Sequence, residues 1–595
     1  MNMPPMTHFT ARAAVRGARL LLPLAFVAAC TVSDADERSH RGQMAEEGDV
    51  SKTVWSPASL TEVKGVPIAT LRAAIQQRLT AKHPDSVSAE AWTHTKRLYK
   101  RFEQSPLWLE RGGLDKERVE ALTNAVLAAT DDGLRIDDYP VAQMARSIAS
   151  VRETKQPTAE QLADADVLLT AAYASLGEDL LVGQVSPKSV GQSWHIDARD
   201  ENVDSALVRT LTKTPLENAI AAMRPTDEDY AALRKQLLRY RELVSKGGWK
   251  PIPAGKALKR GQTESPQRLA ALRARLEAEG ITIAATSAPV PDSNATRGAS
   301  SDAIFDDGLA AAVAQFQARH AIDVDSSLGT ETLNSLNVPA EYRLGQIAAN
   351  LERYRWMPRM LGERYVYVNV PAFQLTAYDS GTTALQMKVI VGEEFEDKAT
   401  PVFSDSMELV VFRPYWNVTP DIQAKEIAPK VAANPGYLAA NDMEYFKDGG
   451  QTRIRQRPGP KNSLGFVKFL FPNDFNIYLH DTPNHELFDK DVRAFSHGCI
   501  RVEKPTELAQ WALGWDASRV EQAMREGKDN QAVKLPKKIP VYIAYGTAYL
   551  RDGQLYFGND LYHRDDQLVK AIATGAVVSP NAVRAMEELK RIATK

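Results

Sequence analysis

The pattern of apolar and polar residues divides the chain into a helical part and a strand-rich part. From about residue 65 to 250, apolar residues recur at three- and four-residue spacing, most clearly over 116–130 and 159–181, which predicts amphipathic helices. From about residue 364, short runs of β-branched and aromatic residues predict strands. We therefore expect a multidomain α+β protein with an all-helical scaffold domain at 63–250 and a mainly β domain at 364–546.

The strand-rich part contains an interruption. The predicted strands cover residues 365–370, 387–392, 409–412, 466–471, 475–480 and 540–545. Between them, residues 420–448 return to helical spacing, and we interpret 420–465 as an inserted helical lid. A connecting helix at 341–363 precedes this domain, and a C-terminal extension at 547–595 follows it. The tail of this extension, at 571–595, returns to helix.

The N-terminus has the pattern of an export signal. Arg12, Arg16 and Arg19 precede a short apolar run at 20–29, which is too short to span a bilayer. The run ends in Val-Ala-Ala-Cys at Cys30, which resembles a bacterial lipobox, although ordinary cleavage at the same bond also suits these small residues. We expect a signal peptide or lipobox at 1–30 and a flexible tether at 31–62.

Composition narrows the class of protein. The chain has 595 residues, too many for one core, and its formal net charge of −2 gives no reason to expect a nucleic-acid partner. Cys30 and Cys499 are its two cysteines, so a disulfide framework is not expected. A lone Cys499 thiol in an oxidising compartment risks oxidation, and this favours a functional role for it.

The segment around Cys499, Ser-His-Gly-Cys-Ile-Arg-Val, has the residues that a thiol nucleophile needs. A thiol becomes a thiolate only beside a proton acceptor, and the histidines nearby are His480, His485 and His497. If Cys499 begins a strand, Arg501 lies on the same face and can hold a thiolate or a carboxylate. Backbone N–H groups around Gly498 and Cys499 can bind a developing oxyanion.

This segment, with a histidine nineteen residues before the cysteine, resembles the active site of L,D-transpeptidases, the YkuD-type catalytic domain. Further stretches resemble the long periplasmic Gram-negative branch of that family. They lie at residues 131–140, 353–358, 367–375, 389–392, 400–404 and 414–422.

The resemblance implies a role for each matching residue. Cys499 is the nucleophile, and His480 is its proton acceptor and later donor. The main-chain carbonyl of Asp481 orients that histidine. The remaining pocket residues are His497, which shapes the oxyanion and substrate pocket, Gly498, Arg501, which orients the donor stem, and Ser496, which hydrogen-bonds behind them.

The implied reaction forms 3→3 cross-links between peptidoglycan tetrapeptide stems through a thioester on Cys499, with release of D-alanine. It needs no cofactor and no metal. Hydrolysis of the thioester, as in an L,D-carboxypeptidase, and attachment of a protein to the wall are alternatives for the same acyl-enzyme. The family further implies acylation by carbapenems.

A second resemblance covers the unit at 255–340, whose stretch 312–337 is similar to small helical peptidoglycan-binding domains. The matching residues are Phe316, Gln317, His320, Asp325, Gly329, Thr332, Leu333 and Asn337. Ser326 stands where glycine is common, which leaves glycan binding open. With the export signal, we expect a periplasmic protein. If Cys30 carries a lipid, Thr31 stands where lipoproteins retained at the inner membrane often have aspartate, so the resemblance favours an outer-membrane anchor. We expect cell-wall synthases as partners of the helical domain.

Three alternatives share some of these features: a zinc site, a wall-binding scaffold and a cysteine endopeptidase. Imidazole and thiolate also bind zinc, but the short paired spacings of structural zinc sites are missing. A wall-binding scaffold without activity would share the export signal and the 255–340 unit. A cysteine endopeptidase would use the same nucleophile and yield shortened stems without dimers.

Overall fold

The structure is a computed structural model that describes residues 59–191, 193–196, 202–284, 303–394, 398–572 and 579–593. The segment interpreted as a signal peptide, Cys30 and the tether up to residue 58 lie outside the described residues. Among the helices within those ranges, none is long and apolar enough to cross a bilayer.

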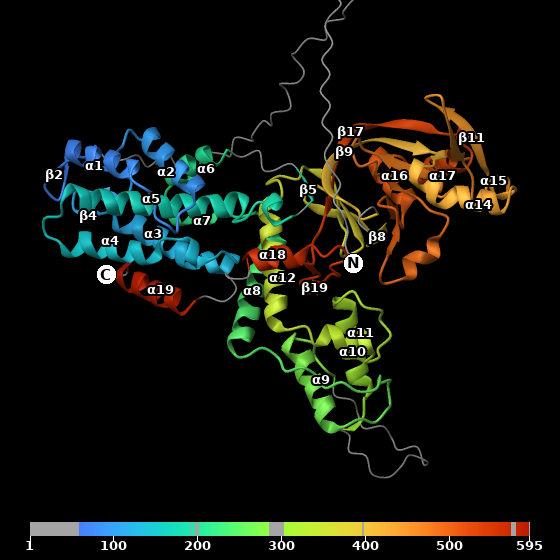
Figure 1. Cartoon of the computed structure of the whole chain (residues 1–595), viewed down its shortest axis with the longest axis horizontal. Helices are drawn as coiled ribbons and strands as arrows, with labels where there is room; N and C mark the ends of the chain where they lie inside the picture. The colour runs from blue at the N-terminus through green and yellow to red at the C-terminus, as the bar shows by residue number, and fades with distance from the viewer. Residues whose placement is uncertain are drawn as a thin grey trace, which may run out of the picture. The chain divides into compact units, whose positions relative to one another are not determined.

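The first part of the chain is a helical assembly built around α5 (Ala159–Val182). This helix is buried along most of its length because α1, α2, α3 and α4 pack around it (Figure 1). A capping box at Thr158 and Gln161 closes its N-terminus. The other helices are α1 (Ile68–Thr80), α2 (Ala89–Arg101), α3 (Lys116–Leu127), α4 (Val141–Glu153), α6 (Val203–Leu211), α7 (Leu216–Ala221) and α8 (Glu228–Ser245). The short strand pair β1 (Glu62–Val63) with β2 (Val66–Pro67) precedes α1, and the pair β3 (Leu109–Glu110) with β4 (Gly113–Leu114) lies between α2 and α3.

A smaller helical unit follows, with a core of its own. It contains α9 (Pro266–Ala278), α10 (Asp307–Arg319) and α11 (Thr330–Leu336). Phe305 and Phe316 are fully buried in its centre. Gln317 fixes the turn before α11, because its side-chain amide donates to Asp325 and Thr332.

The connecting helix α12 (Ala340–Trp356) is shorter than the 341–363 expected from the sequence. Met357 precedes Pro358, and a residue before proline favours extended backbone. Met357 indeed has ψ 150°, which ends the helix there.

The strand-rich domain is a β-sheet that closes on itself. Its strands follow the order β13-β14-β16-β8-β7-β6-β17-β9, and β9 pairs with β13 again. The bounds are β6 (Arg364–Asn369), β7 (Gln374–Asp379), β8 (Thr382–Gly392), β9 (Val402–Phe412), β13 (Val467–Leu470), β14 (Leu479–His480), β16 (Ile500–Val502) and β17 (Gln531–Ala544), with β15 (Ala494–Ser496) beside β8. Helices α16 (Pro505–Leu513) and α17 (Ala517–Arg525) pack on its core.

Two expectations were wrong in detail, one about a strand of this sheet and one about the helical scaffold domain. The strand expected at 475–480 shrinks to β14, because the Asn473 side chain bonds the backbone of Ile477 and holds the preceding residues in a loop. The scaffold region is not all helical. Its β5 (Trp194–His195) pairs with β9 and so joins the sheet of the next domain.

The insertion is only half helical, which corrects the helical lid expected at 420–465. It begins with short helical turns at α13 (Pro420–Ile422), the π-helix η5 (Gln423–Ile427), α14 (Ala428–Ala433) and α15 (Tyr437–Ala440). A hairpin of β11 (Met443–Asp448) and β12 (Gln451–Gln456), extended by β10 (Trp416–Asn417), completes it. Met443 and Ile454 of the hairpin pack on Ile427, so the insertion has its own small core.

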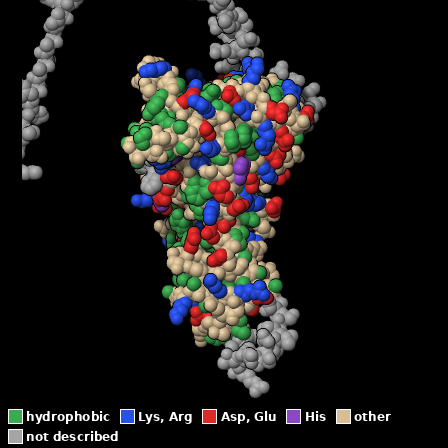
Figure 2. All heavy atoms as spheres, turned by 90° about the vertical axis from the view of Figure 1, so that its right-hand side faces the viewer, with side chains coloured by type: hydrophobic (Ala, Val, Ile, Leu, Met, Phe, Trp, Pro, Cys, Tyr) green, Lys and Arg blue, Asp and Glu red, His purple; other side chains and the backbone are tan. Residues whose placement is uncertain are grey.

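The C-terminal segment returns to the earlier parts of the chain. A hairpin of β18 (Ala548–Arg551) and β19 (Gln554–Phe557) and helix α18 (Asp565–Ile572) share a core with α8 and α12. Helix α19 (Pro580–Ala593) packs on α3 and α4. Figure 2 shows acidic and basic side chains interspersed on the face that it presents, so that face carries no large field of one sign.

Candidate active site

Two short parallel strands place the chemically important side chains together. In β14 and β16, Leu479 lies opposite Ile500, and His480 lies opposite Arg501. Leu479 and Ile500 are fully buried in the core of the domain. Because side chains alternate along a strand, His480 and Arg501 share the other face, and Cys499 directly before β16 joins them. All three line one cavity of about 720 Å³.

The insertion forms the opposite part of this cavity. Trp416, Thr419 and Glu426 line it together with the residues of β14 and β16. Cys499 is partly exposed, so the thiol has access to the space between the two walls. The sulfur is therefore accessible from this cavity.

His480 is nearly buried and held in one orientation. Its Nδ1 lies 2.6 Å from the carbonyl oxygen of Asp481. Because a carbonyl oxygen only accepts, Nδ1 carries the proton and Nε2 keeps its lone pair. Burial, with a smaller contribution from the Arg501 charge, lowers the pKa of His480 to about 3. The imidazole is thus neutral at neutral pH and able to accept a proton.

The carboxylate of Asp481 has a structural role. It accepts hydrogen bonds from the backbone N–H groups of Phe466 and Thr482, and these bonds hold the strand ends together. Of the atoms of Asp481, it is the main-chain carbonyl that contacts His480.

The Cys499 thiol is protonated at rest. It lies 3.6 Å from the carbonyl oxygen of Asn476, to which it donates. Burial raises the pKa of Cys499, and hydrogen bonds from Tyr478 together with the charge of Arg501 oppose that rise. Cys499 and His480 line the same cavity, the first as a thiol and the second as a neutral imidazole.

The turn that carries Cys499 is fixed by backbone hydrogen bonds. Gly498 has φ +106°, a conformation that favours glycine. The hydroxyl of Ser496 accepts from the N–H of Gly498 and donates to the carbonyl of Cys499 at 2.5 Å. Ser496 is therefore a structural clamp on the turn.

The other two residues assigned to the pocket by sequence have different surroundings. The Nε2 of His497 contacts the carboxylate of Glu426, so this histidine joins the catalytic strands to the insertion. Arg501 donates to the carbonyl oxygen of Phe495 at 3.3 Å and faces the cavity. His485 is largely exposed and stands 3.7 Å from Asp481. Within the described ranges, no three His, Cys, Asp or Glu residues are grouped as for a metal ion.

Sequence reasoning missed Tyr478, Asn476 and Glu426. Tyr478 stands two residues before His480, so the alternation of a strand was the signal that could have found it. Asn476 and Glu426 approach from a loop and from the insertion, and no local pattern marks them.

Comparison with known proteins identifies this arrangement. Residues 363–543 match the family model described as the L,D-transpeptidase catalytic domain, YkuD. The chain contains an L,D-transpeptidase catalytic domain. The β-rich L,D-transpeptidase domain and the scaffold domain before it, which matches a family model over residues 93–237, confirm the expected mixture of helical and β-rich domains.

A curated relative supports the same family. The chain is 31% identical over 243 residues to a putative L,D-transpeptidase of Haemophilus influenzae, which covers 38% of this chain and 48% of the relative. The match thus spans about half the length of that relative.

Solved L,D-transpeptidase structures resemble this chain only weakly. One from Xylanimonas cellulosilytica is 15% identical, with a TM-score of 0.17, and covers 50% of this chain and 100% of its own. One from Mycobacterium smegmatis is 12% identical, with a TM-score of 0.16, and covers 31% of this chain and 58% of its own. Because these scores are low, the assignment of residues 363–543 to an L,D-transpeptidase catalytic domain rests on the sequence matches.

Proposed function

We propose that the protein is a peptidoglycan L,D-transpeptidase that forms 3→3 cross-links through a thioester on Cys499. The observation that carries this proposal is the shared cavity of Cys499, His480 and Arg501 on neighbouring strands. The L,D-transpeptidase family supports peptide stems as the substrate class.

The first half-reaction forms the acyl-enzyme. His480 Nε2 takes the thiol proton while the sulfur adds to the carbonyl carbon of the third stem residue, whose π electrons move to oxygen. The carbonyl re-forms, the bond to the terminal D-alanine breaks, and the leaving amine takes the proton from His480. Arg501 faces the cavity with a planar, permanently charged fork suited to the carboxylate of the donor stem.

The second half-reaction releases the product. The side-chain amine of an acceptor stem adds to the thioester, and His480 receives a proton from that amine. The C–S bond then breaks, and the thiolate regains its proton from His480. Water in place of the amine gives the carboxypeptidase outcome, and an amine on a protein gives attachment to the wall.

Two further parts of the chain belong to this proposal. The insertion would act as a lid, because Glu426 contacts His497 across the cavity. The unit of α9, α10 and α11 would be a peptidoglycan-binding domain. Gln317, one of the residues that carry this resemblance, uses its side-chain amide for hydrogen bonds within the unit. Export to the periplasm, a lipid on Cys30 and synthase partners of the scaffold domain remain predictions from the sequence.

Mass analysis of purified disaccharide-tetrapeptide after incubation with the protein tests the proposal. We expect cross-linked dimers together with free D-alanine, and neither product with the Cys499→Ala variant. Tripeptide alone would identify a carboxypeptidase, and shortened stems without dimers an endopeptidase. Unchanged substrate that is still bound would identify a wall-binding scaffold and refute the enzyme.

A further inference from the structure

A residue outside the matched catalytic domain is linked through Thr400 to the turn that carries Cys499. Tyr562 lies between β19 and α18, beyond residue 543 where the family match ends. Its hydroxyl donates to the carbonyl of Gly392 at 2.8 Å and accepts from the N–H of Thr400 at 3.2 Å. Thr400 in turn donates from its hydroxyl to the carbonyl of Gly498 at 2.9 Å. Hydrogen bonds therefore connect the C-terminal segment to the residue before the nucleophile.

Close packing leaves little freedom to this connection. Thr400 is fully buried, and its hydroxyl accepts from the N–H of Gly392 at 2.9 Å. A Cβ added at Gly392 would lie 1.9 Å from the carbonyl oxygen of Lys398, a distance too short for two non-bonded atoms. The backbone around Thr400 therefore packs directly against β8.

The bond from Thr400 fixes a direction that matters for acyl transfer. A trans peptide unit is planar, with its C=O and N–H pointing in opposite directions. Thr400 holds the C=O of the peptide between Gly498 and Cys499, so it also sets where the N–H of Cys499 points. Ser496 holds the peptide groups on either side of this one. Fixed donors aimed at the developing charge are what stabilises an oxyanion.

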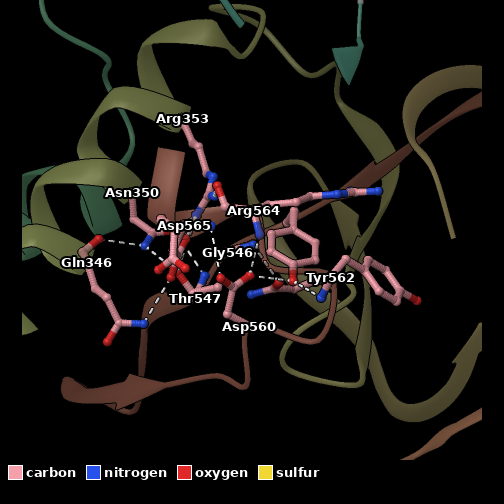
Figure 3. A network of polar contacts seen from close by, with 12 residues as sticks. Gln346, Asn350, Arg353, Gly546, Thr547, Asp560, Tyr562, Arg564 and Asp565 are labelled. Atoms are coloured by element: carbon pink, nitrogen blue, oxygen red, sulfur yellow. Dashed lines mark hydrogen bonds and ion pairs between the residues drawn. The ribbon is translucent and has the colours of Figure 1, made fainter. Parts of the chain in front are cut away.

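The segment with Tyr562 is itself anchored by a buried polar network (Figure 3). The N–H of Tyr562 donates to the hydroxyl of Tyr545 at 2.9 Å, and that hydroxyl donates to Asp560 at 2.7 Å. Asp560 accepts from the N–H of Asp565, whose carboxylate pairs with Arg353 of α12 at 2.6 Å. These bonds lock the Tyr562 backbone to the connecting helix.

We infer that Thr400 and Tyr562 are positioning residues that aim the N–H of Cys499 at the oxyanion formed when the sulfur adds to a carbonyl. In that step the C–S bond forms, the π electrons move to oxygen, and the thiol proton goes to His480. The inference deepens the proposed function and shares with it the assignment of Cys499 as nucleophile. It makes the C-terminal segment part of the active site.

Two thiol reagents separate this role from a general structural one. Acylation by p-nitrophenyl acetate passes through an oxyanion, whereas alkylation by iodoacetamide displaces iodide directly and forms none. The ratio of the two rates at Cys499 therefore reports oxyanion stabilisation independently of thiol access and acidity. It is measured on the full chain for wild type, Thr400→Val, Thr400→Ser and Tyr562→Phe. Tyr556→Phe is the matched control, because this tyrosine stacks on Tyr549 away from the turn.

We expect the ratio of acylation to alkylation to fall about 10- to 100-fold in Thr400→Val, up to the loss typical of one oxyanion donor. Thr400→Ser restores it, because the hydroxyl remains. Tyr562→Phe lowers it by a smaller factor, and Tyr556→Phe leaves it unchanged.

Equal changes in both rates in Thr400→Val and Tyr562→Phe, or no change in either, would overturn the inference. If Thr400→Val fails to fold, Tyr562→Phe decides, because it keeps the partly buried ring. The proposed function fails separately, through a wild-type protein that releases no D-alanine from tetrapeptide.

Discussion

The cavity at Cys499 and the buried network at Asp565 both contain polar and charged side chains, yet they use them differently. Asp565 is fully buried, and its carboxylate accepts hydrogen bonds from three side chains: Arg353, Thr547 and Gln346. Cys499 and Arg501 instead face a cavity of about 720 Å³. A network that is satisfied internally stabilises a fold, whereas one that keeps free capacity toward a cavity can bind and react.

The largest effect on activity is expected when the nucleophile is removed. We expect Cys499→Ala to abolish acylation, because the thiol that faces the cavity is gone, while the melting temperature stays near that of wild type. Mass spectrometry of the protein after exposure to a carbapenem measures this. A retained covalent adduct would contradict the assignment of Cys499.

For Asp565→Ala, we expect the main loss in stability and not in the reacting group. The substitution leaves the buried Arg353 cation without its carboxylate, which costs about 3–5 kcal/mol of unfolding free energy. Denaturant unfolding measures the loss, and Asp566→Ala, an exposed neighbour in the same turn, is the control. Equal stability of the two variants would mean that the network does not hold the C-terminal segment.

The pH dependence of acylation tests the buried state of His480. Its pKa is lowered, so the neutral base persists as the pH falls below the ordinary histidine value of about 6.5. At pH 5, an unperturbed histidine would have lost about 30-fold in its neutral fraction, and we expect little of that loss here. An acid limb centred near pH 6.5 in the rate profile would show that His480 is solvated.

A smaller effect is expected at Arg501. Lysine keeps the charge but not the planar fork, so Arg501→Lys should reduce the rate on tetrapeptide by about tenfold. Steady-state release of D-alanine measures it, with Arg519→Lys on α17 as the control, because Arg519 stacks on Trp515 instead. Unchanged kinetics would give Arg501 a purely structural role.

The smallest effect is expected where the insertion contacts the catalytic strands. Glu426→Gln removes the charge that pairs with His497 at the half-exposed rim, which is worth at most about 1 kcal/mol. We expect a change of a few-fold in KM with kcat preserved, and none in Glu444→Gln, which pairs with Arg455 elsewhere in the insertion. A loss confined to kcat would place His497 in the chemical step.

The same contrast explains what the sequence could predict. The segment at 496–502 and His480 were found because their chemistry is compressed into short runs, and strand alternation places them on one face. Thr400 and Tyr562 were missed because their contacts join segments that are distant along the chain. Helical spacing predicted the helical turns of the insertion up to residue 440 but not β11, whose Met443 packs on Ile427 from a strand. The two residues of β5 are too few to form a pattern.

Helix α19 fills a gap in the first domain with residues from the other end of the chain. Leu589 is fully buried in the same core as the α5 residues, together with Ile592. During synthesis, the N-terminal helices therefore emerge with an open apolar seam that is sealed only after the β domain has been made. A chaperone that shields this seam would favour folding of the nascent protein. A truncation before residue 580 would leave the seam exposed and favour aggregation.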